Sequence, residues 1–288
     1  MTVPCTIPPD LLKSVSRSFY LSIQFLPGKM REPIAIGYLL ARATDTIADS
    51  GNAPLDVRKS ALNQMTALNP DIAFDSHLDQ ISHSGEQQLL RSLPAIFDWL
   101  DSLSPANQKA VEKVLTTIIS GQIWDLDHFT GENQSTSAEE LMQYTYQVAG
   151  CVGEFWTEVG FENLGDHFAD YEDRDILMEH GKRFGKGLQL INIIRDLHED
   201  LPNGRNYLPD DDISHWLEVC RDHLESGSIY VKHLRNRKAK FATTLPLYLA
   251  EATAEKLEKA GIDQIKKQKI KISRKTVFKM AIKAALFS

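Results

Sequence analysis

The sequence predicts an all-α protein that forms one domain across residues 1–288. Apolar residues recur every three or four positions along most of the chain, which is the pattern of amphipathic helices. No run alternates apolar and polar residues between hairpin turns, and no strand–helix–strand order is visible. No Pro-, Gly- or Ser-rich linker divides the chain, so we expect a single helical domain.

Apolar spacing places the first two helices near the N-terminus. The first runs from Pro9 to about Leu26, where Pro27 breaks it. The second can begin at Pro33, because proline is favoured in the first turn of a helix, and it ends near Ser50. Further helices are expected at about 55–68, 86–103, 105–127, 138–158, 164–200, 212–225, 228–260 and 274–286.

The connections between these helices carry few special signals. The polar segment from Asp71 to Gly85 is expected to form a loop. Ser137 precedes two glutamates and is expected to cap the N-terminus of a helix. The run Gly185-Lys186-Gly187 lies in a helical context, so it does not predict a phosphate-binding loop.

Composition limits the class of protein. No stretch of about 18 uninterrupted apolar residues occurs, which predicts no transmembrane helix. Residues 1–10 lack a basic region followed by an apolar core, so no secretory signal is predicted. Cys5, Cys151 and Cys220 are too few and too scattered for a disulfide framework or a zinc cage. We therefore expect a cytoplasmic protein.

Charge is distributed unevenly along the chain, whose net charge is -7. Residues 166–225 contain 15 acidic and 7 basic residues, whereas residues 232–283 contain 15 basic and 4 acidic residues. An acidic protein is a poor candidate for nucleic-acid binding, so no nucleic-acid partner is predicted. The basic region is expected to be a solvated helix face, to meet anionic lipid or to help hold an anionic ligand.

The first candidate site is an acidic pair within residues 42–49. Asp45 and Asp49 are four residues apart, so they lie on one face of the predicted helix, one turn apart. Apolar residues fill both sides of this helix, which indicates an interior position and carboxylates in need of a cationic partner. Arg42 lies one turn before Asp45, and a simple surface ion pair between them is the alternative interpretation.

The second candidate site is a stripe of oxygen-bearing side chains. Asn192, Asp196 and Asp200 step by four along a strongly apolar helix, and Gln189 extends the stripe. Asparagine and carboxylate oxygens suit Mg²⁺, which often bridges one or two carboxylates to phosphate oxygens. Two facing helices with such stripes could therefore hold a diphosphate through magnesium, with Arg42 and Arg195 as further diphosphate ligands.

Five sequence motifs in order resemble those of the squalene and phytoene synthases, the head-to-head trans-isoprenyl diphosphate synthases. The runs DTIAD and NIIRDLHED resemble the two aspartate-rich motifs of that family. The remaining three motifs are the Ser-x-Ser-Phe element at 16–19, the Tyr-x-Tyr-x-Val-Ala-Gly-x-Val-Gly element at 144–153, where Thr145 replaces the usual cysteine, and the Arg-x-Tyr-Leu-Pro element at 205–209.

The resemblance implies an isoprenoid synthase fold, a helical bundle around a large central cavity. It implies Mg²⁺ on Asp45, Asp49, Asn192, Asp196 and Asp200, and a prenyl diphosphate substrate, most often farnesyl diphosphate. It further implies catalytic roles for Tyr144, Arg42, Arg195 and Tyr207. The substrate-binding residues it implies are Ser16, Ser18, Phe19, Tyr38, Arg42, Val148, Val152, Gly153, Gln189, Arg205 and Tyr207.

Two glycines in the element at 144–153 allow two interpretations. Gly150 and Gly153 each cost a helix about 1 kcal/mol relative to alanine. The small residues either leave room for a prenyl chain or allow two helices to pack closely. The nearby run Gly121 to Leu126 resembles a further family motif, but no chemistry is assigned to it.

The resemblance favours squalene synthase, with NADPH as the reductant and possible peripheral contact with a membrane. Asp45-Thr46 and the run Asn192-Ile193-Ile194 resemble squalene synthases, whereas Val152-Gly153-Glu154 and Asp125-Leu126 resemble the carotenoid branch as well. Phytoene synthase, dehydrosqualene synthase and a presqualene diphosphate synthase of a split pathway are therefore the alternatives. More distant alternatives are a non-catalytic assembly factor of the same fold and a terpene-cyclising or chain-elongating enzyme. The oligomeric state is not predicted.

Overall fold

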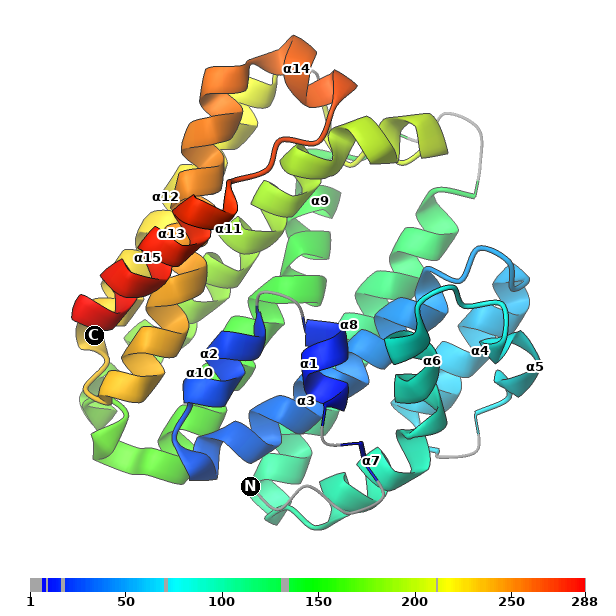
Figure 1. Cartoon of the computed structure of the whole chain (residues 1–288), viewed down its shortest axis with the longest axis horizontal. Coiled ribbons are helices and arrows are strands. Elements are labelled where there is room, and N and C mark those ends of the chain that lie inside the picture. Colours follow the sequence, from blue (N-terminus) through cyan, green and yellow to red (C-terminus); the bar gives the residue numbers. More distant parts are fainter. Residues whose placement is uncertain are drawn as a thin grey trace.

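Every regular element in the described part of the chain is helical. The computed structural model describes residues 7–8, 10–16, 19–69, 72–130, 135–210 and 212–287. Within them the chain forms α-helices, short 3₁₀ turns and one π-helical turn (Figure 1). The all-α prediction is confirmed.

The helices are α1 (Leu11–Ser16), α2 (Phe19–Phe25), α3 (Gly28–Ala48), α4 (Leu55–Thr66), α5 (Asp75–Leu78), α6 (Ser84–Arg91), α7 (Leu93–Asp101), α8 (Pro105–His128), α9 (Ala138–Thr145), α10 (Cys151–Leu164), α11 (Arg174–Asp200), α12 (Ile213–His233), α13 (Arg237–Ala260), α14 (Ile262–Lys267) and α15 (Arg274–Leu286). The short turns are η1 (Tyr146–Gly150), η2 (Gly165–His167), η3 (Tyr171–Asp173) and η4 (Leu201–Asn203). Among the described residues, the longest helices are α3, α8, α11, α12 and α13, and the shorter helices pack around them.

Several predicted helices are divided in the structure. The stretch 86–103 becomes α6 and α7, because Ser92 ends one helix and precedes Pro94 in the first turn of the next. The stretch 138–158 begins at a capping box on Ser137, as expected, but passes through a π-helical turn before α10. The expected loop at 71–85 contains the short helix α5. The first predicted helix becomes α1 and α2.

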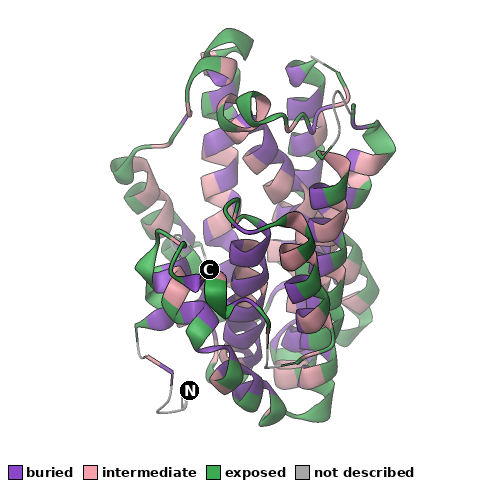
Figure 2. Cartoon of the chain, turned by 90° about the vertical axis from the view of Figure 1, so that its right-hand side faces the viewer, coloured by how far each residue is buried: buried purple, intermediate pink, exposed green. Residues whose placement is uncertain are grey.

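The long helices pack in a chain of neighbours around a shared interior. Helix α11 lies against α10 and α12, α12 lies against α13, and α3 lies against α8 (Figure 1). One apolar cluster gathers around α3, α4, α7 and α8, and a second gathers around α11, α12 and α13. Buried residues run through the middle of these helices, whereas exposed residues cover the outside (Figure 2). Among the described helices, none combines the length and apolar character needed to cross a bilayer.

Glycines bring α10 and α11 into backbone contact. A Cβ atom added at Gly153 would lie 1.9 Å from the carbonyl oxygen of Gly181, and one at Gly185 would lie 2.2 Å from the carbonyl oxygen of Ala149. These distances are far inside van der Waals contact. Close helix packing therefore requires glycine at 153, although the same residue also lines the central cavity.

We expect Gly153→Ala to destabilise the protein by about 3 kcal/mol, because two helices must separate to admit one methyl group. Urea unfolding followed by circular dichroism measures this change. Gly28→Ala is the matched control, since an added Cβ at Gly28 meets no atom within 4 Å. Equal unfolding midpoints for the two variants would contradict the close-packing interpretation.

Candidate active site

A largely apolar cavity of about 410 Å³ lies between the two apolar clusters. Its walls come from α2, α3, α8, α9, η1, α10, α11, α12 and α13, so segments distant in sequence share it. The volume falls in the range of small-molecule binding sites. Polar side chains from α3 and α11 join this apolar wall, and they include members of both aspartate-rich motifs.

The first motif occupies the last turns of α3. Asp45 lines the cavity and forms an ion pair with Arg42, whose guanidinium also pairs with Glu86 of α6. Asp49, one turn later, lines an adjoining hollow of about 190 Å³ that Arg42 and Asp45 share. The opposite face of α3 is fully buried, for example at Ile47, and this burial fixes the direction of the acidic face.

The second motif occupies the last three turns of α11. Asn192 lines the cavity beside Gln189, and its Nδ2 lies 3.5 Å from the Gln189 Oε1. Asp196 pairs with Arg195, the adjacent residue. Asp200 is the last residue of the helix, and burial together with the negative charge of Asp196 raises its pKa to about 6.

A lysine from the connection between α14 and α15 also pairs with the second motif. The Lys269 Nζ lies 3.0 Å from Asp196 Oδ1 and 2.9 Å from Glu199 Oε2. Burial alone would raise the pKa of Asp196, but the pairs with Arg195 and Lys269 outweigh it and lower that pKa. Asp196 is therefore held ionised by two cations.

Arg205 joins the two motifs through a network of charges. Its Nη1 lies 3.8 Å from Asp49 Oδ1 and 3.8 Å from Asp125 Oδ2, and its backbone N–H donates to the Asp200 carbonyl at 3.0 Å. Tyr207 donates a hydrogen bond to the Asp125 carboxylate. Burial raises the pKa of Asp125, while Arg205 and Tyr207 act in the opposite direction.

Aromatic rings pack beside this network. The Tyr144 and Tyr207 rings stack with centroids 5.2 Å apart, and Trp124 lies 5.2 Å from Tyr144. Phe129 meets Tyr207 edge-on at 4.8 Å. Burial raises the pKa of both tyrosines well above the usual range, so their phenols stay protonated as hydrogen-bond donors.

The structure divides the predicted site residues into those that line the central cavity and those that lie outside its wall. Those that line the cavity are Phe19, Tyr38, Arg42, Asp45, Tyr144, Val148, Val152, Gly153, Gln189 and Asn192. Those that lie outside the cavity wall are Ser16, Asp49, Arg195, Asp196, Asp200, Arg205 and Tyr207. Ser16 is buried and donates its hydroxyl to the Leu12 carbonyl. Ser18 lies outside the described residues.

Sequence reasoning assigned no role to Asp125 and Gln122, which lie in the run Gly121 to Leu126 that resembles a family motif, and it missed Lys269. Asp125 lies seven residues after Ile118 on the buried stripe of α8, and a carboxylate on an apolar stripe was the available signal. Gln122 lines the cavity 9% exposed, and its Oε1 finds no hydrogen-bond partner among the described residues. No sequence signal could have placed Lys269, because its contact depends on how the α14–α15 connection folds back.

The oxygen donors of these side chains fit magnesium, which prefers hard oxygen ligands. In the described part of the chain, no three His, Cys, Asp or Glu side chains lie close enough to hold a metal ion. Mg²⁺ usually keeps several waters and binds through one or two carboxylates plus substrate phosphates. Asp45 and Asn192 present such oxygens to the cavity, so diphosphate oxygens would have to complete the coordination.

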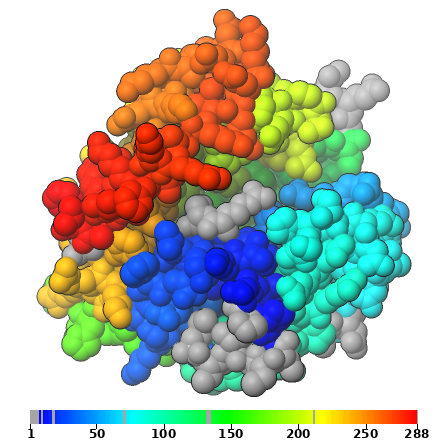
Figure 3. All heavy atoms as spheres, viewed as in Figure 1, coloured from blue at the N-terminus to red at the C-terminus, as the bar shows by residue number. Residues whose placement is uncertain are grey.

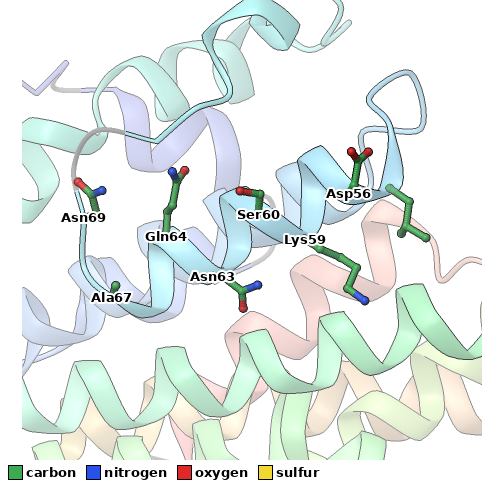
Figure 4. Close-up of a pocket in the computed structure, with 8 residues that line it drawn as sticks. Asp56, Lys59, Ser60, Asn63, Gln64, Ala67 and Asn69 are labelled. Atoms are coloured by element: carbon green, nitrogen blue, oxygen red, sulfur yellow. The ribbon is translucent and has the colours of Figure 1, made fainter.

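A second hollow, of about 680 Å³, is a surface groove along α4 (Figure 4). Its lining residues all come from α4 and the turn that follows, and their side chains fan out along one helix (Figure 4). Lys59, which lines it, pairs with Asp127 of α8. The groove does not bring reactive groups together from different elements, so the central cavity is the candidate active site.

The described part of the chain is an all-helical bundle with an apolar cavity that arginine, carboxylate and tyrosine side chains border. A sequence profile described as squalene/phytoene synthase matches residues 12–219. The chain belongs to the squalene/phytoene synthase family, whose members are prenyltransferases.

Relatives within this family include both branches. The chain is 29% identical to the squalene synthase of Homo sapiens over 224 residues, which cover 76% of this chain and 49% of that protein. It is 29% identical to Botryococcus squalene synthase of Botryococcus braunii over 197 residues, which cover 66% of this chain and 39% of that protein. It is 26% identical to a bifunctional lycopene cyclase/phytoene synthase of Pyrenophora tritici-repentis, with 86% of this chain and 40% of that protein covered. The chain spans less than half the length of these relatives.

Solved structures share the fold. A structure of TcSQS with the ligand E5700 superposes with a TM-score of 0.77 at 22% identity, covering 96% of this chain and 84% of that chain. A dehydrosqualene synthase in complex with a ligand gives a TM-score of 0.63 at 19% identity, covering 96% and 94%. Both similarities show that the fold is shared, and they carry no argument about activity.

We expect Tyr207→Phe to destabilise the protein by roughly 1–3 kcal/mol at pH 7, because the buried Asp125 carboxylate loses a hydrogen bond. The folded-state pKa of Asp125 is raised above its unfolded value, and losing the phenol raises it further. A carboxyl group whose pKa is raised by folding lowers the free energy of unfolding as the pH rises through that pKa. Tyr207→Phe should therefore destabilise the protein less near pH 4 than at pH 7. Urea unfolding of both proteins at the two pH values measures this.

The exposed Tyr171 provides the control for that substitution, since Tyr171→Phe removes a hydroxyl that lies 3.4 Å from Arg174 at the surface. We expect Tyr171→Phe to change the unfolding free energy by less than about 0.5 kcal/mol at either pH. A pH-independent loss in Tyr207→Phe would show that the hydroxyl does not act through Asp125.

Proposed function

We propose that this protein is a squalene synthase that joins two molecules of farnesyl diphosphate head to head. The observation that carries the proposal is that Asp45 of the first motif and Asn192 of the second line one apolar cavity. That arrangement suits a substrate with a long hydrocarbon tail and a diphosphate head. Membership of the family and the similarity to squalene synthases support the choice of reaction.

The reaction has two halves that balance separately. In the first, the C–O bond to one diphosphate breaks, and the double bond of the second substrate attacks the allylic cation. Loss of a proton closes a cyclopropane and gives presqualene diphosphate, with diphosphate released. In the second half, the remaining diphosphate leaves, the carbon skeleton rearranges, and a hydride from NADPH gives squalene and NADP⁺.

The residues of this chain serve the reaction by binding the head groups and excluding water. Arg42 lines the cavity and can share its guanidinium between Asp45 and a diphosphate oxygen. Tyr144 also lines the cavity and remains a protonated donor, so it can bind the departing oxygen. The apolar walls contributed by Val148, Val152 and Phe155 protect a carbocation from solvent.

Tyr207 and Arg205 lie behind Tyr144, and in our proposal they position this tyrosine and the ends of both motifs. Magnesium, when bound, would supply positive charge that stabilises the departing diphosphate. Asp45, Asp49, Asn192, Asp196 and Asp200 are the residues proposed to hold it. Arg195 is proposed as a further diphosphate ligand, once a metal ion competes with it for Asp196.

The carotenoid branch is the second candidate function. The match to a phytoene synthase covers 86% of this chain, more than the match to the squalene synthase of Homo sapiens covers. In that case the final cation loses a proton and NADPH is not consumed. We assign no residues to NADPH, and the requirement for it is a question for the assay.

We expect Asp45→Ala and Asp196→Ala to lower turnover at least about a hundredfold while the helical content is retained, because each removes a proposed metal ligand near the surface of the site. A second readout is the melting temperature with Mg²⁺ and inorganic diphosphate, which should rise in the unmodified protein and stay level in both variants.

Asp175→Ala is the control on the same helix, since Asp175 is exposed in the first turn of α11, far along the helix from Asp196. We expect it to keep both turnover and the thermal shift. Full activity in Asp45→Ala or Asp196→Ala, with a normal response to Mg²⁺ and diphosphate, would refute the metal assignment.

Incubation with farnesyl diphosphate and Mg²⁺, with and without NADPH, distinguishes the candidate products. We expect squalene, identified by mass spectrometry of the extracted hydrocarbons, only when NADPH is present. Dehydrosqualene under both conditions, or phytoene from the C20 substrate, would assign the protein to the carotenoid branch. Accumulated presqualene diphosphate would show a split pathway, and no condensation product from either substrate would refute prenyl transfer.

A further inference from the structure

The last helix presents large apolar side chains to solvent. On α15, Phe278 is 69% exposed, Ile282 is 46% exposed and Leu286 is 76% exposed. These residues are four apart, so they form one stripe on one face of the helix. Phe287, directly after the helix, is 67% exposed and extends the same surface. Large apolar side chains that are exposed next to one another in this way indicate an interaction site.

The other face of α15 is already packed. Ala284 is fully buried, and α15 lies against α13 (Figure 1). The Lys283 Nζ lies 4.1 Å from the centre of the Tyr248 ring on α13, which is a cation–π contact. The inner face of α15 therefore packs on α13, whereas no described part of the chain covers its apolar outer face.

Cationic side chains share the outer face. Arg274, Lys275 and Lys279 are exposed, and at 100° per residue all three fall on the same side of α15 as the apolar stripe. None of the three forms an ion pair with the described residues. Residues 232–283 carry 15 basic and 4 acidic residues in a chain of net charge -7, so positive charge is concentrated in the region of the chain that leads into and includes most of α15.

A second apolar segment lies on the same side of the molecule. Leu21 and Phe25 of α2 are exposed, and the Phe25 ring packs 4.8 Å from Phe241 of α13. Helices α2 and α15 both pack on α13, and both are visible on one face of the molecule (Figure 3). Phe19 of α2 and Pro246 of α13 line the central cavity, so this face adjoins the cavity wall.

We propose that α15, together with α2, docks on the surface of a bilayer that contains anionic lipid. A helix with an apolar face and flanking lysines lies in the plane of the membrane interface. Its apolar side chains enter the boundary between head groups and acyl chains, while its lysines extend to anionic head groups. Neighbouring charge distinguishes this partner from a second copy of the chain, because two α15 helices face to face would bring Lys275 and Lys279 of both copies together.

The first experiment is sedimentation of the full chain with vesicles, in the absence of substrate. We expect binding to vesicles of phosphatidylcholine mixed with phosphatidylglycerol, weaker binding to phosphatidylcholine alone, and loss of the difference at high salt. Phe278→Ser/Ile282→Ser/Leu286→Ser should lower the vesicle partition constant at least about tenfold. Lys275→Glu/Lys279→Glu should remove the preference for anionic vesicles.

Matched controls change exposed residues elsewhere. Ile176→Ser removes an exposed apolar side chain of α11, and Lys109→Glu makes the same kind of charge change on α8. Both controls should bind vesicles like the unmodified protein, and all variants should keep its melting temperature. Equal binding by the α15 variants and the controls would overturn the proposal. So would a concentration-dependent dimer, seen by analytical ultracentrifugation, that disappears in the triple-serine variant.

The proposal is independent of the catalytic one, because vesicle binding is measured without turnover. If the protein binds vesicles but makes no hydrocarbon, the docking surface stands and the proposed reaction fails. If it makes hydrocarbon from detergent-dispersed substrate but does not bind vesicles, the proposed reaction stands and the proposed docking surface fails.

Discussion

The polar part of the site depends on the ion pairs that the Arg205 guanidinium forms with neighbouring carboxylates. This guanidinium lies 3.8 Å from a carboxylate oxygen of Asp49 on α3 and the same distance from one of Asp125 on α8. Several acidic side chains converge here, and without a shared cation their mutual repulsion and their burial would both favour protonation. Arg205 follows the short turn η4, and its backbone N–H donates to the carbonyl of Asp200, so it links the end of the second motif to the first.

The apolar cavity walls and the acidic motifs at the border of the cavity need opposite environments. The walls exclude water, which makes each unpaired polar atom costly, whereas the motifs need ionised oxygens. The structure separates the two demands: Asp45 and Asn192 reach the cavity, while Asp196 is held at its outer side between Arg195 and Lys269. Gln122 is the exception, since its amide oxygen is buried at the cavity without a partner among the described residues.

The sequence predicted those features that follow from local spacing. Steps of four residues placed Asp45 and Asp49, and Asn192 and Asp196, on common helix faces, and the last helix was expected at the residues where α15 lies. Features that depend on neighbours were not predictable from spacing. The π-helical turn at 146–150 shifts the register of its helix, and the contact of Lys269 arises only when the chain folds back over α11.

The glycine contact between α10 and α11 has a consequence for redesign of the cavity. Where Gly153 meets Gly181, that side of the chamber consists of main chain, which offers no side chain to shorten. In the proposed reaction, a longer prenyl tail would therefore have to be accommodated elsewhere, at walls such as Val114 and Ile118 of α8, whose shortening would deepen the chamber. The depth of the chamber is thus separable from the helix crossing that maintains the architecture.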